Sequence, residues 1–265
     1  MIHMTLGLCR EIALAGVICL AIGSWCSGAD ARAGAEKPPL TAREIVQRSH
    51  DLLRDDESYA RVEMTIVRPR WTRTLVMDAW TQGTDRSLIR VLEPKKDRGV
   101  SFLKRDREGW QYVPSIDRVI KIPPSMMLQS WMGSDFTNDD IVRADSIITD
   151  YDHAIKREFS NGDDAYWLIE AKAKDGAPVV WGSIVFTVRK DNLVATRIEY
   201  FDERGVLVKH AVTSDVKRIE GREVATRFKM IDDSDSEHFT VVKYRDLTFS
   251  PDLSSSMFSL RELRR

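Results

Sequence analysis

Apolar and polar residues alternate along most of this chain, after one segment with a different period. From residue 41 to about residue 54, apolar residues recur at the spacing of one helix face. Thr41 precedes this segment and Glu44 follows three residues later, so the sequence predicts a capping box and a helix with Thr41 as its N-cap. From Tyr59 onward the period is two, which is typical of strands with one apolar face.

The alternating segments are short, and turns rich in Gly, Asp and Asn separate them. Strands are predicted at residues 59–66, 75–79, 89–91, 100–102, 110–112, 118–122, 166–171, 183–189, 194–201, 206–214, 223–231 and 238–247. A sheet of about a dozen antiparallel strands tends to curl or close. The pattern alone therefore predicts a curled antiparallel sheet with flanking helices, an apolar inner face and a charged outer face.

The N-terminal residues have the features of a secretory signal peptide. Residues 12–23 are almost all apolar, follow Arg10 and precede small residues, and the run is too short to span a bilayer comfortably. Two cleavage motifs of the form A-x-A compete, at residues 29–31 and 31–33, and we favour the second. The expected organisation is a signal peptide at residues 1–33, a mature N-terminal tail at 34–40 and one ligand-binding domain at 41–265.

Composition narrows the possible chemistry. The chain has 3 Cys, namely Cys9, Cys19 and Cys26, and all precede both cleavage motifs, so thiol catalysis and Cys-bound zinc are excluded for the mature protein. The alternatives to cleavage are an uncleaved anchor and acylation at Cys26, although the bulky Trp25 beside it does not fit a lipoprotein signal. The net charge of −1 gives no electrostatic argument for a nucleic-acid partner.

The segment from Trp110 to Asp140 combines two short strands with a methionine-rich flap. Methionine is unbranched and polarizable, so such a surface can adapt to an irregular apolar ligand. The residues expected to line or cover a ligand cavity are Trp110, Tyr112, Ile120, Ile122, Met126, Met127, Leu128, Trp131, Met132 and Phe136. Plain core packing is the alternative. Arg118 and Asp135 are expected to pair and hold the flap to the rim, and Thr137 is expected to cap a further short helix.

The order of residues in this segment resembles the outer-membrane lipoprotein-sorting family, the LolA-like proteins of Gram-negative bacteria. The matching patterns are W-x-Y-x-P, R-V-x-x-I-P and S-x-M-G-S-D-F within residues 110–136, and M-F-S-L at 257–260. The resemblance extends over about residues 41–265. It implies a mainly β (α+β) fold, in which an open, incomplete β-barrel encloses a hollow that helices and a loop cover.

The same resemblance implies a function in the periplasm. The expected protein is a carrier that takes an acylated or lipidic cargo from an inner-membrane transporter and delivers it to an outer-membrane acceptor. The cargo is a lipoprotein, or equally a hopanoid, a phospholipid or another lipid. The alternative is an envelope-stress sensor whose lipid-binding half-barrel contacts a membrane signalling partner.

Residues suited to catalysis or metal binding are sparse and scattered. The 5 His residues have no further His or Cys at ligand spacing, and His50 is expected on the polar side of the first helix. Residues 232–238 resemble a calcium loop but lack its central Gly. We therefore expect no metal site, no cofactor, no enzymatic activity and no transmembrane segment in the mature protein.

The first testable prediction concerns export. Because the general signal peptidase cleaves after A-x-A, N-terminal sequencing of the exported protein should begin at Gly34 or at Arg32. An acyl group on Cys26, or an intact N-terminus in the membrane fraction, would contradict cleavage at these positions.

Overall fold

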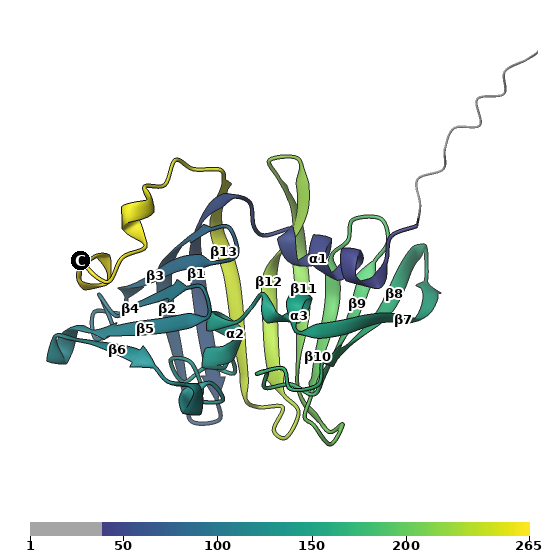
Figure 1. Cartoon of the computed structure of the whole chain (residues 1–265), viewed down its shortest axis with the longest axis horizontal. Coiled ribbons are helices and arrows are strands. Elements are labelled where there is room, and N and C mark those ends of the chain that lie inside the picture. The colour runs from purple at the N-terminus through teal and green to yellow at the C-terminus, as the bar shows by residue number, and fades with distance from the viewer. Residues whose placement is uncertain (1–38) are drawn as a thin grey trace, which may run out of the picture. The chain divides into compact units, whose positions relative to one another are not determined.

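Thirteen antiparallel strands form one continuous sheet in this computed structural model, which describes residues 39–265 (Figure 1). The predicted signal peptide lies outside the described residues. The strand order is β6-β5-β4-β3-β2-β1-β13-β12-β11-β10-β9-β8-β7, so the edges β6 and β7 do not pair and the sheet stays open. The expected incomplete barrel with few helices is thus confirmed.

The strands alternate with tight turns, and the helices are few and short. The strands are β1 Glu57–Arg68, β2 Trp71–Gln82, β3 Arg86–Glu93, β4 Ser101–Arg105, β5 Glu108–Val113, β6 Arg118–Ile122, β7 Tyr151–Asn161, β8 Asp164–Ala173, β9 Ser183–Arg189, β10 Ala195–Phe201, β11 Leu207–Ile219, β12 Arg222–Asp232 and β13 Phe239–Phe249. The α-helices are α1 Ala42–Asp51, α2 Asn138–Val142 and α3 Ser146–Thr149. Four 3₁₀ turns are η1 Pro114–Ile116, η2 Pro124–Met126, η3 Ser255–Met257 and η4 Glu262–Arg264.

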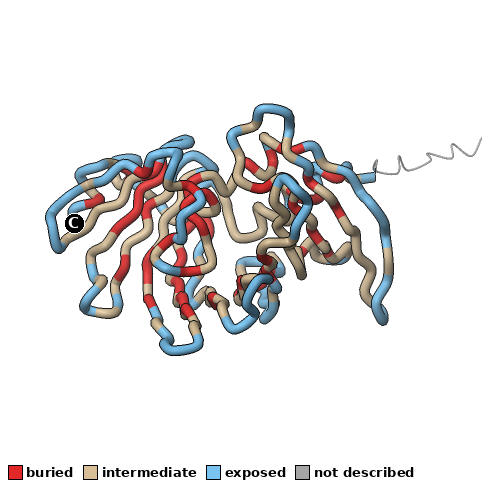
Figure 2. The backbone as a smooth tube through the Cα atoms, turned by 90° about the horizontal axis from the view of Figure 1, so that it is seen from below, coloured by how far each residue is buried: buried red, intermediate tan, exposed pale blue. Residues whose placement is uncertain are grey.

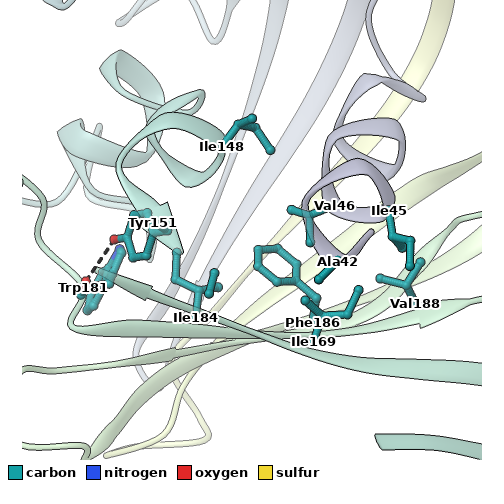
Figure 3. Close-up of a cluster of buried hydrophobic side chains, with 11 residues drawn as sticks. Ala42, Ile45, Val46, Ile148, Tyr151, Ile169, Trp181, Ile184, Phe186 and Val188 are labelled. Carbon is teal, nitrogen blue, oxygen red and sulfur yellow. Dashed lines mark hydrogen bonds between the residues drawn. The ribbon is translucent and has the colours of Figure 1, made fainter. Parts of the chain in front are cut away.

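Helix α1 begins as the sequence predicts. The backbone N–H of Glu44 donates to Thr41 Oγ1 at 3.2 Å, and the Thr41 N–H donates to the Glu44 carboxylate at 2.8 Å. The buried face of the helix, with Ile45 and Val46, packs on the side chains of β8 and β9 (Figure 3). This contact covers the inner face of the half of the sheet that ends at β7.

Strand β7 was absent from the sequence prediction. Its residues are mostly exposed, and only Tyr151 is buried, so no apolar alternation marks the strand. It is an edge strand, and charged residues such as Lys156, Arg157 and Glu158 reduce the tendency of an edge to pair with other chains. The antiparallel pairing with β8 holds β7 in the sheet, whereas the sequence of β7 alone does not indicate a strand.

One part of the outer face is apolar, which differs from the expected charged surface. Figure 2 shows burial along the backbone, with exposed residues concentrated in the turns and buried residues within the strands. Successive residues of a strand point to opposite faces, so Leu88 on β3 lies opposite to the inward-facing Ile89. Leu88 and Leu103 form an outer cluster with Phe258 and Leu263 from the C-terminal segment. The C-terminal residues therefore cover the outer face of β3–β5.

The second prediction concerns this C-terminal cover. Replacing Leu263, which is 0% exposed, with Ala should lower the free energy of unfolding by about 2–5 kcal/mol, because a buried cavity is left. Leu260→Ala is the matched control, since Leu260 is 42% exposed and its truncation should change little. Urea denaturation followed by tryptophan fluorescence measures both. Equal stability of the two variants would show that the segment is not part of the folded unit.

Candidate ligand-binding hollow

The inner face of the sheet encloses two adjoining cavities of about 340 Å³ and about 250 Å³. Together we call them the hollow, and its size is in the range of about 300–1,000 Å³ that is usual for ligand pockets. The residues that line both cavities are Leu53, Val62, Ala79, Ile89, Ile141, Phe228 and Tyr244. The wall thus combines residues from β1, β2, β3, β12 and β13 with the end of the α1 segment and α2.

The two cavities follow one another along β1. The inward side chains of this strand are small at one end, with Ser58 and Ala60, and larger and apolar further on, with Val62 and Met64. Ser58 and Ala60 line the larger cavity and Met64 lines the smaller one, while Val62 lines both. Because a strand rises about 3.3 Å per residue, the stretch from Ser58 to Met64 corresponds to about 20 Å. The hollow is therefore elongated.

We call the smaller cavity the apolar lobe. Among its lining side chains, only Tyr244, with its hydroxyl, and Trp131, with its indole nitrogen, carry an oxygen or nitrogen atom. Its lining residues are Leu53, Val62, Met64, Met77, Ala79, Ile89, Trp131, Phe136, Ile141, Phe228, Val242 and Tyr244. The larger cavity, which we call the polar lobe, is also lined mostly by apolar side chains, but it adds Ser49, His50, Arg54, Ser58, Thr81, Ser87 and Asp140. The hollow is thus more polar at one end than at the other.

Residues 123–150 connect the two edge strands and cover the inner face; we call this segment the strap. Within it the Trp131 N–H donates to the Phe136 carbonyl at 2.8 Å, and Ser130 bridges to Thr137, which makes a tight hairpin. Met132 has a positive φ of 55° at its tip. The hairpin places Trp131 and Phe136 side by side at the apolar lobe.

Outside the strap lies an open cleft of about 1,080 Å³, which we call the outer cleft. Phe136 lines both this cleft and the apolar lobe, so it lies where the two spaces approach each other. The cleft is bounded by Met127 and Leu128 of the strap, by Val180 and Trp181 before β9, and by the turns after β10 and β12.

Aspartates of the strap bind basic residues of the sheet. Asp135 pairs with Arg68 of β1 at 3.0 Å and accepts a hydrogen bond from Thr240 of β13 at 2.6 Å. Asp140 pairs with Lys209 of β11, whose side chain is only 6% exposed. Such buried pairs position a segment more than they stabilise it, because desolvation offsets much of the attraction.

Lys209 lies between two aromatic rings. Its Nζ is 4.7 Å from the ring centre of Trp181 and 5.0 Å from that of Tyr200, so cation–π attraction adds to the pair with Asp140. The Trp181 indole N–H also donates to Asp140, at 3.4 Å. The strap is therefore attached to the β7-side half of the sheet at Asp140.

Asp145 attaches the strap to the other half. It pairs with Lys104 of β4 and with Arg54, which follows α1, and His50 Nε2 lies 3.8 Å away. Burial raises the pKa of Asp145, but the charges of Arg54 and Lys104 lower the pKa by more, so the carboxylate stays ionised. Burial also lowers the pKa of His50, which is therefore neutral at pH 7.

The expected polar-side position of His50 is wrong, because its side chain is only 13% exposed and faces the hollow. His50 follows the buried Val46 by four residues, and residues at that spacing share one face of a helix.

The sequence-predicted cavity residues occupy three different places. Trp131 and Phe136 line the apolar lobe, whereas Met127 and Leu128 line the outer cleft. Met127 packs on Ile122 and Val142, with Met126 beside them, and Met132 packs against the core of β1 and β2. Ile120 on the edge strand is 42% exposed. Ligand contact by these side chains stays a prediction.

Two expectations need correction. Trp110 and Tyr112 do not line the hollow, because they face the outer side of β5 and pack under Met257 and Phe258. Asp135 does not pair with Arg118 in the described structure. Its partner is Arg68, while Arg118 is exposed on β6.

Most residues of the wall were visible in the sequence only as strand residues. Val62, Met64, Met77, Ala79 and Ile89 carry the apolar alternation, which does not tell a cavity wall from a packed core. Phe228 and Tyr244 belong to predicted strands as well, but nothing near them in the sequence marks a ligand.

Asp139 in the first turn of α2 is a buried acid that sequence reasoning missed. Its side chain is 6% exposed, and its Oδ1 has no hydrogen-bond partner among the described residues. Burial, with the nearby charge of Asp140, raises the pKa of Asp139 to about 6, although Arg143 at 3.5 Å acts in the opposite direction. Asp139 lines a side pocket of about 160 Å³ together with Tyr200.

Residues 39–265 contain no cluster of three or more His, Cys, Asp or Glu that is arranged to hold a metal ion. No helix in this part of the chain is long and apolar enough to cross a membrane.

A family model described as an uncharacterized protein matches residues 83–265. Among solved structures, a DUF1329 family protein from Desulfovibrio piger has a TM-score of 0.77 and 26% identity, and the match covers 84% of this chain and 97% of the other. A comparison with curated proteins found no match.

Two other solved structures show the fold at lower identity. An outer membrane lipoprotein-sorting protein domain from Vibrio parahaemolyticus matches with a TM-score of 0.75 and 21% identity, over 84% of this chain and 98% of the other. A LolA superfamily protein from Nitrosomonas europaea matches with a TM-score of 0.73 and 22% identity, over 84% and 100%. The described chain therefore has the LolA-like fold that the sequence resemblance implied.

The third prediction concerns the pH dependence that Asp139 causes. Its folded-state pKa of about 6 is above the unfolded value of about 3.9, so the folded state holds the proton more tightly between these values. The free energy of unfolding should therefore fall as the pH rises through this window, by up to about 3 kcal/mol.

The variant Asp139→Asn should lack this decrease, so its stability relative to the native chain should improve from pH 4.5 to pH 7.5. Urea denaturation at four pH values measures the difference. Asp152→Asn, on the exposed side of β7, is the control and should follow the native profile. Parallel profiles for Asp139→Asn and the native chain would rule out an elevated pKa at this site.

Proposed function

The chain belongs to the family of uncharacterized proteins whose model matches residues 83–265, and from its LolA-like fold we propose that it is a periplasmic carrier of an acylated or lipidic cargo. The observation that carries this proposal is the elongated hollow with an apolar lobe on the inner face of the sheet. An apolar chain of the cargo would occupy this hollow without any covalent step.

Burial of hydrocarbon supplies enough affinity for such a carrier. Each buried methylene contributes about 0.8 kcal/mol, so about ten of them contribute on the order of 8 kcal/mol. A binding free energy of that size corresponds to a dissociation constant of about 1 μM, before the costs of association are subtracted. Affinity in this range permits both uptake and release.

The route of the cargo follows from the position of the outer cleft. Phe136 borders both the cleft and the apolar lobe, so movement of the hairpin around Trp131 and Phe136 would open the hollow toward the cleft. In the proposed cycle an inner-membrane transporter loads the carrier and an outer-membrane acceptor unloads it. The predicted signal peptide supports the periplasm as the compartment. No feature of residues 39–265 favours the alternative sensor function over this one.

The fourth prediction tests where the cargo binds. Ala79 lines both lobes, so Ala79→Phe places a ring in the empty space of the hollow. Binding of a fluorescent diacylated lipopeptide should weaken at least about tenfold, whereas stability should stay equal or increase, because the ring fills a void. Fluorescence titration and urea denaturation measure the two effects.

Ala154→Phe is the matched control, since it adds the same ring to an exposed position on β7 and should leave binding unchanged. Native mass spectrometry of protein purified from periplasm should show a co-purified lipid in the native chain but not in Ala79→Phe. Normal binding by Ala79→Phe would exclude the hollow as the cargo site.

A further inference from the structure

Tyr244 on β13 carries an unusual hydroxyl group. Four of the six tyrosines donate a hydrogen bond to another residue: Tyr59 to Asp78, Tyr112 to Asp117, Tyr151 to the Trp181 carbonyl and Tyr166 to Asp164. Tyr200 and Tyr244 make none to any described residue. Tyr200 lines the side pocket, whereas Tyr244 lines both lobes of the hollow.

Tyr244 is partly buried and borders the hollow, so a ligand in the hollow can supply the hydrogen-bond partner that its hydroxyl lacks among the described residues. Burial raises the pKa of Tyr244, so its hydroxyl stays protonated and able to donate at neutral pH. The ring is fixed by β13 and by the ring of Phe228, 5.9 Å away between centres. Tyr244 therefore presents a donor at the junction of the two lobes.

A water molecule is a poor partner on the apolar side of this junction. An ordered buried water needs about two to four polar partners. Apart from Tyr244 and the indole of Trp131, whose Nε1 is buried away from the cavity space, the side chains that line the apolar lobe are hydrocarbon or thioether. A polar group attached to a bound hydrocarbon chain is held in place by that chain. It can therefore accept the hydrogen bond from Tyr244 without needing several other polar partners.

The charged groups around the hollow are already paired. Arg54 is the cation that lines the polar lobe, and it binds Asp145, which also binds Lys104. Asp140 is the acid in the same wall, and it binds Lys209. An anionic headgroup in the hollow would find no uncommitted cation among these groups, and an unpaired buried charge is very costly.

We propose that the hollow selects an uncharged lipid that carries an ester or amide carbonyl, and that Tyr244 is the residue that binds this carbonyl. The proposal rests on the carrier function and specifies its ligand class. The hydrocarbon chain lies in the apolar lobe under Trp131 and Phe136, and the carbonyl accepts from the Tyr244 hydroxyl. The polar end of the lipid lies in the polar lobe, near Ser58 and Thr81.

The fifth prediction compares three lipids with the same 16-carbon chain: the glycerol monoester, the glycerol monoether without a carbonyl, and the free fatty acid anion. Each displaces a fluorescent lipopeptide from the native chain, from Tyr244→Phe and from Tyr200→Phe. The native chain should bind the ester about 3–10-fold more tightly than the ether, the effect of one hydrogen bond. It should bind the anion at least about tenfold more weakly than the ester at pH 7.5.

Tyr244→Phe should remove the preference for the ester and leave ether affinity unchanged. Tyr200→Phe, the matched control, should keep the native preference, because Tyr200 lines the side pocket and not the hollow. Equal weakening of ester and ether by Tyr244→Phe, or native affinity for the anion equal to that for the ester, would overturn the proposal while the carrier function stands. Failure of the fluorescent lipopeptide itself to bind the native chain would overturn both.

Discussion

The rest of the structure depends on one topological constraint: β6 and β7 are consecutive in the chain but form opposite edges of a thirteen-stranded sheet. The strap between them must therefore cross the inner face, and it covers the hollow by doing so. Aspartates at every fifth position fix its course: Asp135, Asp140, Asp145 and Asp150 pair with Arg68, Lys209, Lys104 and Arg107 respectively. The basic partners come from distant parts of the sheet, so these pairs determine where the strap lies.

The hollow exists because the strap and α1 cover the sheet without filling its curve. One core cluster lies under α1 against β8 and β9, and another lies on β1 and β2 around Trp131. Between the two clusters the wall residues have space on one side and lose packing contacts there. A protein that keeps such a space is less stable than one in which the space is filled. Functional sites commonly lower the stability of a fold in this way.

Local sequence rules predicted the helices and strands well. They did not predict which segments pack against each face of a strand. The capping box of Thr41 and Glu44 defined α1, and alternation defined twelve strands, because both signals depend on neighbouring residues. Alternation could not tell which face of β5 is inside, since a segment about 150 residues later covers Trp110. The partner of Asp135 is Arg68, 67 residues away, and no local pattern indicates a contact over that separation.

The pairing of β1 with β13 has a consequence for how the molecule is made. Each half of the sheet is a meander of local hairpins, whereas Ser58 in β1 faces Phe249 in β13, near the other end of the sequence. Contacts of such long sequence separation form slowly, because the entropy of closing the loop must be overcome first. Both strands belong to the wall of the hollow. We therefore expect the binding space to form late in folding, so that a nascent or partly folded chain would lack a cavity in which lipid could be trapped prematurely.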